Sequence, residues 1–310
     1  MIMFPDQKTF AFTILDDTDD STLENVKPVY DCLKANGLRT TKTVWPVDCP
    51  EGSKDFFAAD TLQRTEYLEF VQHLARDGFE IAFHGATMES SRRARTVAAL
   101  EFLRDKFGRC PSLSCNHGFN RENLYWGRKR FHTPGLKRLA GLFLKEAQSY
   151  YVGDDEGSEY FWGDLSKAHV KYVRNFTFDG LNVLEADPYM PYSLAQTPCV
   201  NRWFSTADAP DAAAFVRSLS EPRLQALERA GGICILSTHL GKGFVKDGRL
   251  DPQVEAIFRY LGRRPGWYVP TGSILDFLLA VRGANGPLGR WQLMKLELRF
   301  LLDKLYARMA

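Results

Sequence analysis

Short apolar runs alternate with longer amphipathic segments in the first third of the chain. Residues 9–15 (TFAFTIL), 40–47 (TTKTVWPV) and 79–83 (FEIAF) are rich in β-branched and aromatic residues and predict strands. Residues 21–36, 61–76 and 92–107 have helical periodicity, and a glycine follows each of them closely. In the first of these helices we expect Ser21 as the N-cap, with Glu24 completing a capping box.

The same alternation returns after residue 212. Regular periodicity resumes at 212–230. Strands are predicted for ICIL at 233–236 and WYVP at 267–270, and helices for 252–261 and 273–281. The middle of the chain, 110–205, is aromatic-rich and poorly periodic, so no elements are assigned there. Strands alternating with helices predict an α/β fold in which parallel strands lie under a helical layer. A length of 310 residues fits either a single α/β barrel domain or about two smaller domains.

Polar residues fall where the predicted strands end. The first strand ends in Asp16 and Asp17, the third in His84, the segment SLSCNHG in His117, and the late strand ICILSTH in His239. Functional groups in parallel α/β proteins gather at such ends. Imidazoles and carboxylates suit a zinc-like ion, which takes three protein ligands and activates water. A carboxylate can then accept a proton and a histidine can donate one, although a single histidine after a strand is more often a hydrogen-bonded loop residue.

The order of these motifs resembles the polysaccharide deacetylase family, carbohydrate esterase family 4. LDDTDDST, EIAFHGATME, CNHGFN and ILSTHL follow one another over residues 9–245. The resemblance implies a single-domain distorted (β/α) barrel, which we place over residues 1–282 because a Gly/Pro-rich break follows at 283–289. Residues 283–310 are expected to form a C-terminal extension with an amphipathic helix. The resemblance also implies metal-dependent removal of an acyl group, in the first instance acetyl, from an N-acylated sugar. Carried over residue by residue, it makes Asp16 the general base, Asp17 and His84 metal ligands, and His239 the catalytic acid.

The ligand set departs from the family pattern at two places. The family's second metal histidine falls at position 88, where this chain has Met88, and a thioether is a poor ligand for a zinc-like ion. The segment SCNHG, residues 114–118, stands where the family has an RxPxG motif. His117 is therefore a candidate third ligand, the alternative being a loop histidine. Weaker substitutes are Asp19, Asp20 and Glu89, the first two being expected to favour the dipole of the following helix.

Polar and aromatic residues near these motifs are candidates for binding a saccharide. We single out Asn116, Trp126, Arg202 and Trp203. Flat rings suit sugar faces and arginine suits a carboxylate or phosphate, but core packing and surface ion pairs are the alternatives. The function expected is hydrolysis of an N-acylated sugar in a polysaccharide, glycan or lipid-linked saccharide. The alternatives are a catalytically inactive carbohydrate-binding or regulatory protein on the same scaffold, and hydrolysis of another amide.

Composition limits the partners and the compartment. The net charge of +2 gives no case for nucleic acid as the main partner. Six scattered cysteines without a CxxC pair predict reduced thiols, and the first residues do not read as a signal peptide, so a cytoplasmic location is expected. The expected cofactor is a divalent ion, zinc first, then nickel or cobalt. The segment 291–309 has apolar residues at helical spacing beside several cations; it could pack on its own domain, join a homo-oligomer, or contact the inner face of a membrane.

Overall fold

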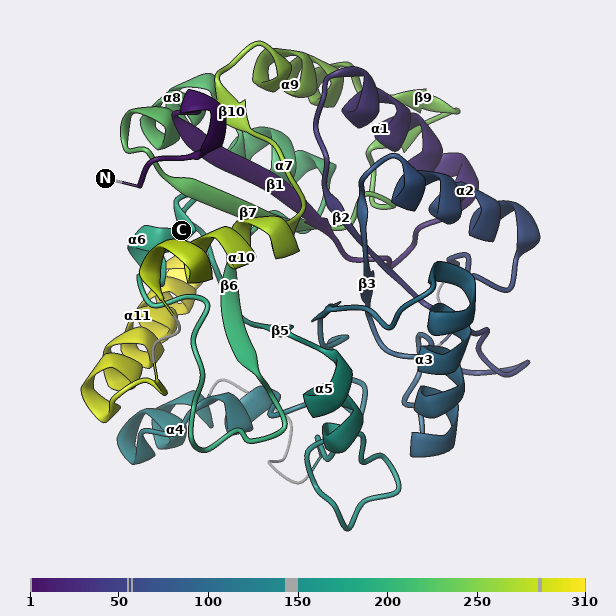
Figure 1. Cartoon of the computed structure of the whole chain (residues 1–310), viewed down its shortest axis with the longest axis vertical. Coiled ribbons are helices and arrows are strands. Elements are labelled where there is room, and N and C mark those ends of the chain that lie inside the picture. The colour runs from purple at the N-terminus through teal and green to yellow at the C-terminus, as the bar shows by residue number, and fades with distance from the viewer. Residues whose placement is uncertain (1, 55, 57, 143–149, 284–285, 310) are drawn as a thin grey trace.

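A closed barrel of seven parallel strands forms the centre of the molecule (Figure 1). The computed structural model describes residues 2–54, 56, 58–142, 150–283 and 286–309. Each barrel strand pairs with the next in chain order: β1 (Phe10–Asp16), β2 (Thr41–Val44), β3 (Glu80–Phe83), β4 (Leu113–Ser114), β5 (Tyr172–Phe178), β6 (Arg202–Asp208) and β7 (Ile233–Thr238). The predicted distorted (β/α) barrel is confirmed.

The first strand closes the barrel and also accounts for its irregular shape. Strand β1 pairs with β7 along nearly its whole length, from Ala11 opposite Ile233 to Asp16 opposite Thr238. Its other edge is shared: β10 (Gly266–Trp267) pairs with the beginning of β1, and β2 pairs with its end. Strand β1 is buried at every position, which is why TFAFTIL reads as a continuous apolar run.

Helices surround the barrel (Figure 1). In chain order they are α1 (Leu23–Ala35), α2 (Thr65–Arg76), α3 (Arg93–Phe107), α4 (Pro134–Ala140), α5 (Gly163–His169), α6 (Val183–Ala186), α7 (Ala212–Ser218), α8 (Glu221–Arg229), α9 (Pro252–Gly262), α10 (Thr271–Arg282) and α11 (Arg290–Met309). Two 3-10 turns, Pro5–Gln7 and Gly127–Arg130, and a small hairpin, β8 (Val245–Lys246) with β9 (Arg249–Leu250), complete the described elements.

The N-terminal cap of α1 lies one residue later than predicted. The cap is Thr22, whose hydroxyl accepts from the backbone N–H of Asn25, while the Asn25 side chain accepts from the backbone N–H of Thr22. The prediction of Ser21 and Glu24 was wrong because the chain is still turning at Ser21. The backbone N–H of Ser21 donates to the backbone oxygen of Thr18 in that turn, and Glu24 instead pairs with Arg64, the residue before α2.

The segment 110–205 holds two complete barrel strands, β4 and β5, and the start of β6, with long stretches of loops and short helices between them. Strand β4 has two residues, which is too short for any periodicity to show in the sequence. Strand β5 carries Arg174 and Asn175 in its middle, and a register shift follows them, so its apolar pattern is broken. The regular stretch at 212–230 is two helices, α7 and α8, that meet near Ser220.

Helix α11 packs against the barrel. Phe300 contacts Phe131, Phe176 and Phe178, with the centroids of the Phe176 and Phe300 rings 4.5 Å apart. The buried carboxylate of Glu297 accepts from the backbone N–H groups that lead into α4. The division of the chain at 282/283 stays a prediction, although α10 ends at Arg282. Among the described residues, no helix has both the length and the hydrophobicity needed to cross a membrane.

Candidate active site

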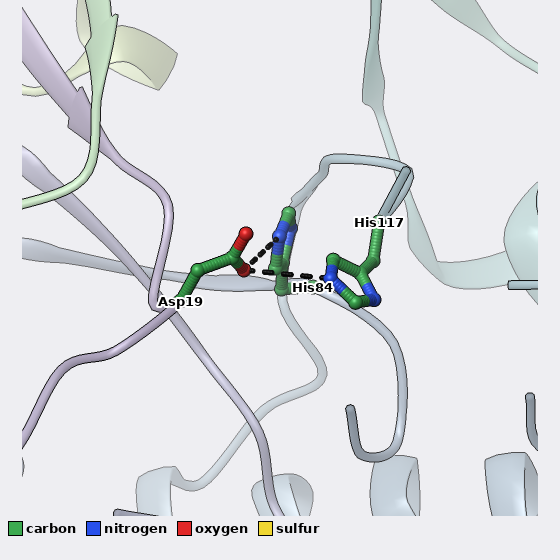
Figure 2. A group of neighbouring side chains, drawn as sticks. All are labelled: Asp19, His84 and His117. Atoms are coloured by element: carbon green, nitrogen blue, oxygen red, sulfur yellow. Dashed lines mark ion pairs between the residues drawn. The ribbon is translucent and has the colours of Figure 1, made fainter. Parts of the chain in front are cut away.

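Three side chains from three different strand ends converge at the carboxyl end of the barrel. Asp19 lies in the loop after β1, His84 follows β3, and His117 follows β4. The Nε2 atoms of His84 and His117 lie 3.3 and 3.6 Å from Oδ1 of Asp19. Figure 2 shows the carboxylate facing the two imidazoles. One ligand atom from each residue lies within 4.8 Å of the others, so this group is a candidate metal site.

The second nitrogen of each imidazole is held by a carbonyl oxygen. His84 Nδ1 lies 3.2 Å from the backbone oxygen of Cys115, and His117 Nδ1 lies 3.3 Å from Oδ1 of Asn120. The orientation of the Asn120 amide is fixed because its nitrogen donates to the backbone oxygen of Thr87. Because a carbonyl oxygen only accepts, Nδ1 is the donor in both contacts, and in a neutral imidazole this leaves the Nε2 lone pair on the side of Asp19. Metal-binding histidines are commonly oriented in this way.

The donor set fits a divalent cation. Two imidazole lone pairs directed at a carboxylate oxygen repel it unless positive charge lies between them. Two ligand atoms about 2.1 Å from a tetrahedral zinc lie roughly 3.4 Å apart, which agrees with the observed separations. Oδ1 of Asp19 is buried and accepts no hydrogen bond from the described residues. Burial, followed by the charge of His84, lowers the pKa of His117 to about 4, so this imidazole stays neutral and able to bind metal.

Asp17 points into the barrel beside this group. Its Oδ2 accepts from Nη1 of Arg174 at 2.7 Å and from the Ser237 hydroxyl at 3.3 Å. Its Oδ1 lies 3.8 Å from Nδ1 of His84 and has no hydrogen-bond partner among the described residues. Burial raises the pKa of Asp17, but Arg174 and then His84 outweigh burial and hold that pKa below its usual range. Asp17 is thus an ionised carboxylate with one oxygen tethered and the other directed at the site.

Asp16 does not face the site, which corrects the placement expected from the sequence. Its Oδ2 accepts from the Tyr30 hydroxyl at 2.8 Å and from Nζ of Lys42 at 2.9 Å, and its Oδ1 accepts from the backbone N–H of Leu240. The charged side chains of Asp16 and Lys42 are both fully buried. Successive residues of a strand face opposite sides, so Asp16 points outward to the helical layer and Asp17 inward. The geometry therefore favours a structural role for Asp16.

His239 lies on the other side of Asp19. Its Nε2 is 3.3 Å from Oδ2 of Asp19, and its Nδ1 donates to the backbone oxygen of Pro210 at 2.7 Å. Burial lowers the pKa of His239, but the hydrogen bond to Asp19 and the charge of Asp17 outweigh burial and raise it. The side chains of His239 and Asp19 are 18% and 14% exposed, so the site opens to solvent on this side. Lys242 also lies there, with Nζ 3.8 Å from Asp19.

The four residues expected to bind a saccharide are scattered. Asn116 is buried and forms two hydrogen bonds with the backbone of Leu124, so it shapes its own loop. Trp126 is half-buried and donates to the backbone oxygen of Gly118, next to His117. Arg202 and Trp203 begin β6 and therefore lie at the opposite end of the barrel from the site, and Trp203 is buried. The geometry leaves Trp126 as the one member of this set beside the site.

Several residues at the site were not identified from the sequence. The sequence marks Asp19 only as a weak substitute ligand, and nothing in it distinguishes Asn120 or Lys242. Arg174 was missed because β5 was not recognised, although a cation within YVRNFTF needs a partner when its strand is buried. Trp45, at the end of β2, packs its ring against both His84 and His117. Its indole nitrogen donates to the backbone oxygen of His84, and nothing in the sequence marked it.

Comparison with known proteins identifies the fold. No family model matches the sequence, and no curated protein matches it. A Mycobacterium smegmatis protein assigned to the polysaccharide deacetylases is 15% identical, with a TM-score of 0.53, and the match covers 93% of this chain and 96% of that one. The peptidoglycan deacetylase PdaC of Bacillus subtilis is 12% identical, with a TM-score of 0.43 and coverage of 90% and 95%.

A family 4 acetyl xylan esterase from Clostridium thermocellum, solved in complex with a cobalt ion, is 12% identical, with a TM-score of 0.38 and coverage of 89% and 92%. Of these three likenesses, the first alone is close enough to establish a common fold, and at 15% identity it establishes the fold and no more. The resemblance drawn from the sequence motifs is confirmed at this level. The chain has the fold of the polysaccharide deacetylases.

Proposed function

We propose that the protein is a metal-dependent hydrolase that removes an acyl group, in the first instance acetyl, from an N-acylated sugar. The observation that carries this proposal is the convergence of Asp19, His84 and His117 beside an ionised Asp17 and a histidine, His239. The proposed substrate is a polysaccharide, glycan or lipid-linked saccharide. The shared fold supports a deacetylase more than an unrelated hydrolase, because the chemistry proposed here uses the strand ends that this fold brings together.

Asp19, His84 and His117 would hold the cation, with zinc as the first candidate and nickel or cobalt as the others. Asp19 replaces Asp17 in the ligand set expected from the sequence, because it is the carboxylate that faces both Nε2 atoms. When bound, a divalent cation of this kind makes water nucleophilic near neutral pH and polarises an amide carbonyl. Asn120 and the backbone of Cys115 keep the two imidazoles in the tautomer that can bind it.

Asp17 is the general base in this proposal. Its free oxygen accepts a proton from the attacking water, while Arg174 holds the other oxygen and keeps the carboxylate ionised. The water oxygen bonds to the amide carbon, and the bond from that carbon to nitrogen then breaks. His239 donates a proton from Nε2 to the departing nitrogen, so the products are a free amino sugar and the carboxylate of the acyl group. The base is thus Asp17 and no longer Asp16.

An inactive binding protein on the same scaffold is less well supported. Binding a sugar needs neither a tethered, ionised carboxylate nor a histidine of raised pKa facing the same three ligands. The loss of the family's histidine at Met88 was the best argument for inactivity. His117 offers a second imidazole from the next strand end, and this removes much of that argument.

The test compares two neighbouring aspartates. Purified protein loaded with zinc or cobalt is incubated with N-acetylated oligosaccharides, and the release of acetate is measured. We expect Asp17→Asn to lower kcat by a factor of about 10² to 10⁴ with the metal content unchanged, because a general base contributes this much. Asp16→Asn is the matched control and should keep at least a tenth of the activity per folded molecule. Loss in the Asp16→Asn variant alone would return the base to Asp16, and no activity in the wild type on any N-acylated sugar would reject the proposal.

A further inference from the structure

One face of helix α11 packs against the barrel and the other faces solvent. Its inner face is occupied by the barrel, where Leu293, Leu296, Phe300 and Leu301 are buried. Its outer face consists of the exposed positions Arg290, Trp291, Gln292, Lys295, Leu298, Arg299, Leu302 and Tyr306. A helix that lies on a domain is expected to be polar on its outer side. Half of the residues on this outer face are large and apolar.

The apolar residues of the outer face form one stripe. At 100° per residue, Leu298, Trp291, Leu302 and Tyr306 fall within an arc of about 80° on the helix. Trp291 and Tyr306, at the two ends of the stripe, are 74% and 68% exposed. Helix α4, which packs against α11 (Figure 1), adds the exposed Leu139, and the exposed Leu142 follows two residues after the helix ends. An apolar stripe of this length is not needed for folding, because the opposite side of the helix already provides the contacts with the barrel.

The charge around the stripe has one sign. Arg290, Lys295 and Arg299 are exposed and form no ion pair with the described residues. The acidic residues of α11 are turned away: Glu297 is buried against the start of α4, and Asp303 accepts from the backbone of Asp179. Helix α4 has no acidic residue and adds cations of its own. The outer face is therefore apolar and basic.

We propose that the outer face of α11 is a docking surface for a lipid bilayer that carries anionic headgroups. Tryptophan and tyrosine favour the interface between headgroups and acyl chains, and cations beside an apolar stripe are attracted to anionic lipid. A second copy of this chain is a poorer occupant. A symmetric contact through this face would bring like charges from both copies together. This inference does not depend on the proposed hydrolysis.

Docking would bring the lipid surface close to the mouth of the barrel. Lys304, near the end of α11, lies 3.5 Å from Asp179, which follows β5, and 3.9 Å from Asp208, which ends β6. Both strands end at the same side of the barrel as the candidate active site. The second half of α11 thus lies beside the end of the barrel that carries Asp19, so a saccharide attached to a lipid headgroup would be presented near the site.

Vesicle binding tests the inference with the full chain. Co-sedimentation is measured with vesicles of phosphatidylglycerol and phosphatidylcholine, and with vesicles of phosphatidylcholine alone. We expect binding to the anionic vesicles that weakens as salt is added, and at least tenfold weaker binding to phosphatidylcholine. The variant Trp291→Ser/Leu298→Ser/Leu302→Ser should bind at least tenfold more weakly. The variant Lys295→Glu/Arg299→Glu should lose about fivefold or more per reversed cation at low salt.

A matched control reverses two exposed cations elsewhere. Lys246→Glu/Arg249→Glu changes the net charge by the same amount in the β8–β9 hairpin, which lies far from α11 in Figure 1. It should bind like the wild type. The substituted side chains are all exposed, so each variant should fold, and circular dichroism checks that it does. Equal binding of the wild type and both α11 variants would overturn the proposal. The proposal would also be overturned if light scattering showed that the wild type is a dimer and that the triple serine variant is a monomer.

Discussion

The neighbouring carboxylates Asp16 and Asp17 differ in role because a strand turns successive side chains to opposite sides. Asp16 is fully buried between the barrel and the helices, in contact with Lys42 and Tyr30. Asp17 faces the barrel interior, where Arg174 reaches it. The order of motifs along the chain shows which segment corresponds to a family motif. An error of one residue in that correspondence, however, places the side chain on the opposite side of the barrel wall. In this chain the acids that face the site are Asp17 and Asp19.

The buried pair of Asp16 and Lys42 allows a prediction about stability. Lys42→Met leaves a carboxylate buried without its cation, and breaking such a pair typically costs about 3–5 kcal/mol of unfolding free energy. Urea denaturation at neutral pH measures this loss. Lys42→Met/Asp16→Asn is the control, because the amide oxygen still accepts from the backbone N–H of Leu240, the amide nitrogen can donate to the Tyr30 hydroxyl oxygen, and the side chain carries no charge. We expect it to recover most of the loss, and a single variant that costs less than about 1 kcal/mol would contradict the structural role of the pair.

At the scale of loops, Asn120 decides how His117 is presented. Asn120→Leu removes the acceptor that holds His117 Nδ1, so the imidazole can rotate or change tautomer. We expect metal affinity to fall by about 10- to 100-fold, as for other residues that orient metal ligands. Competition with a chromophoric chelator measures the affinity. Asn120→Asp keeps an acceptor at the same place and should bind metal more tightly than the leucine variant; equal affinity in the two variants would mean that Asn120 does not orient His117.

The loops after β1 and β7 meet at a glycine. A side chain at Gly241 would lie 2.7 Å from the backbone nitrogen of Ser21 and even closer to the carbonyl oxygen of Asp20. Gly241→Ala must therefore push the loop of Asp19 away from that of His239. We expect kcat to fall at least tenfold with the fold retained, because a displacement of about 1 Å at a site can cost this much or more. Gly180→Ala, where the added carbon meets nothing, is the control; wild-type turnover in Gly241→Ala would contradict this packing.

The sequence predicted elements well where each one is long and periodic. Strand β1 was recognised because it is a continuous, fully buried run, and helices α1, α2 and α3 were recognised within a few residues because their apolar positions repeat with one period and a glycine follows each helix. It did not predict β4, which has two residues, or β5, whose inward Arg174 is paired with Asp17, 157 residues away in the chain. Strand-end histidines mark candidate ligands in the sequence, whereas nothing along the chain distinguishes Asp19, because its partners come from three other loops.

At the scale of the molecule, one buried carboxyl should make stability depend on pH. Burial raises the pKa of Glu122 to about 8, from an ordinary value of about 4.5. The folded protein then holds a proton that the unfolded chain has already lost. The contribution to stability is complete below about pH 4.5 and is lost as the pH rises to 8, by on the order of a few kcal/mol.

Glu122→Gln should flatten this dependence, since the amide cannot ionise. Thermal unfolding at pH 5 and pH 8 measures the difference, with the exposed Glu101→Gln as the control that keeps the wild-type slope. An identical slope in Glu122→Gln and the wild type would show that this carboxyl is already ionised in the folded protein.

The closed barrel brings four strand ends, distant in the sequence, to one opening, and a shared cation is the central claim of this account. The most direct measurement is anomalous diffraction at the cobalt edge from crystals soaked in a cobalt(II) salt. The account predicts one strong peak about 2.0–2.2 Å from Oδ1 of Asp19 and from Nε2 of His84 and His117, absent in Asp19→Ala. A peak held by Asp16, or no peak within reach of these three atoms, would contradict it.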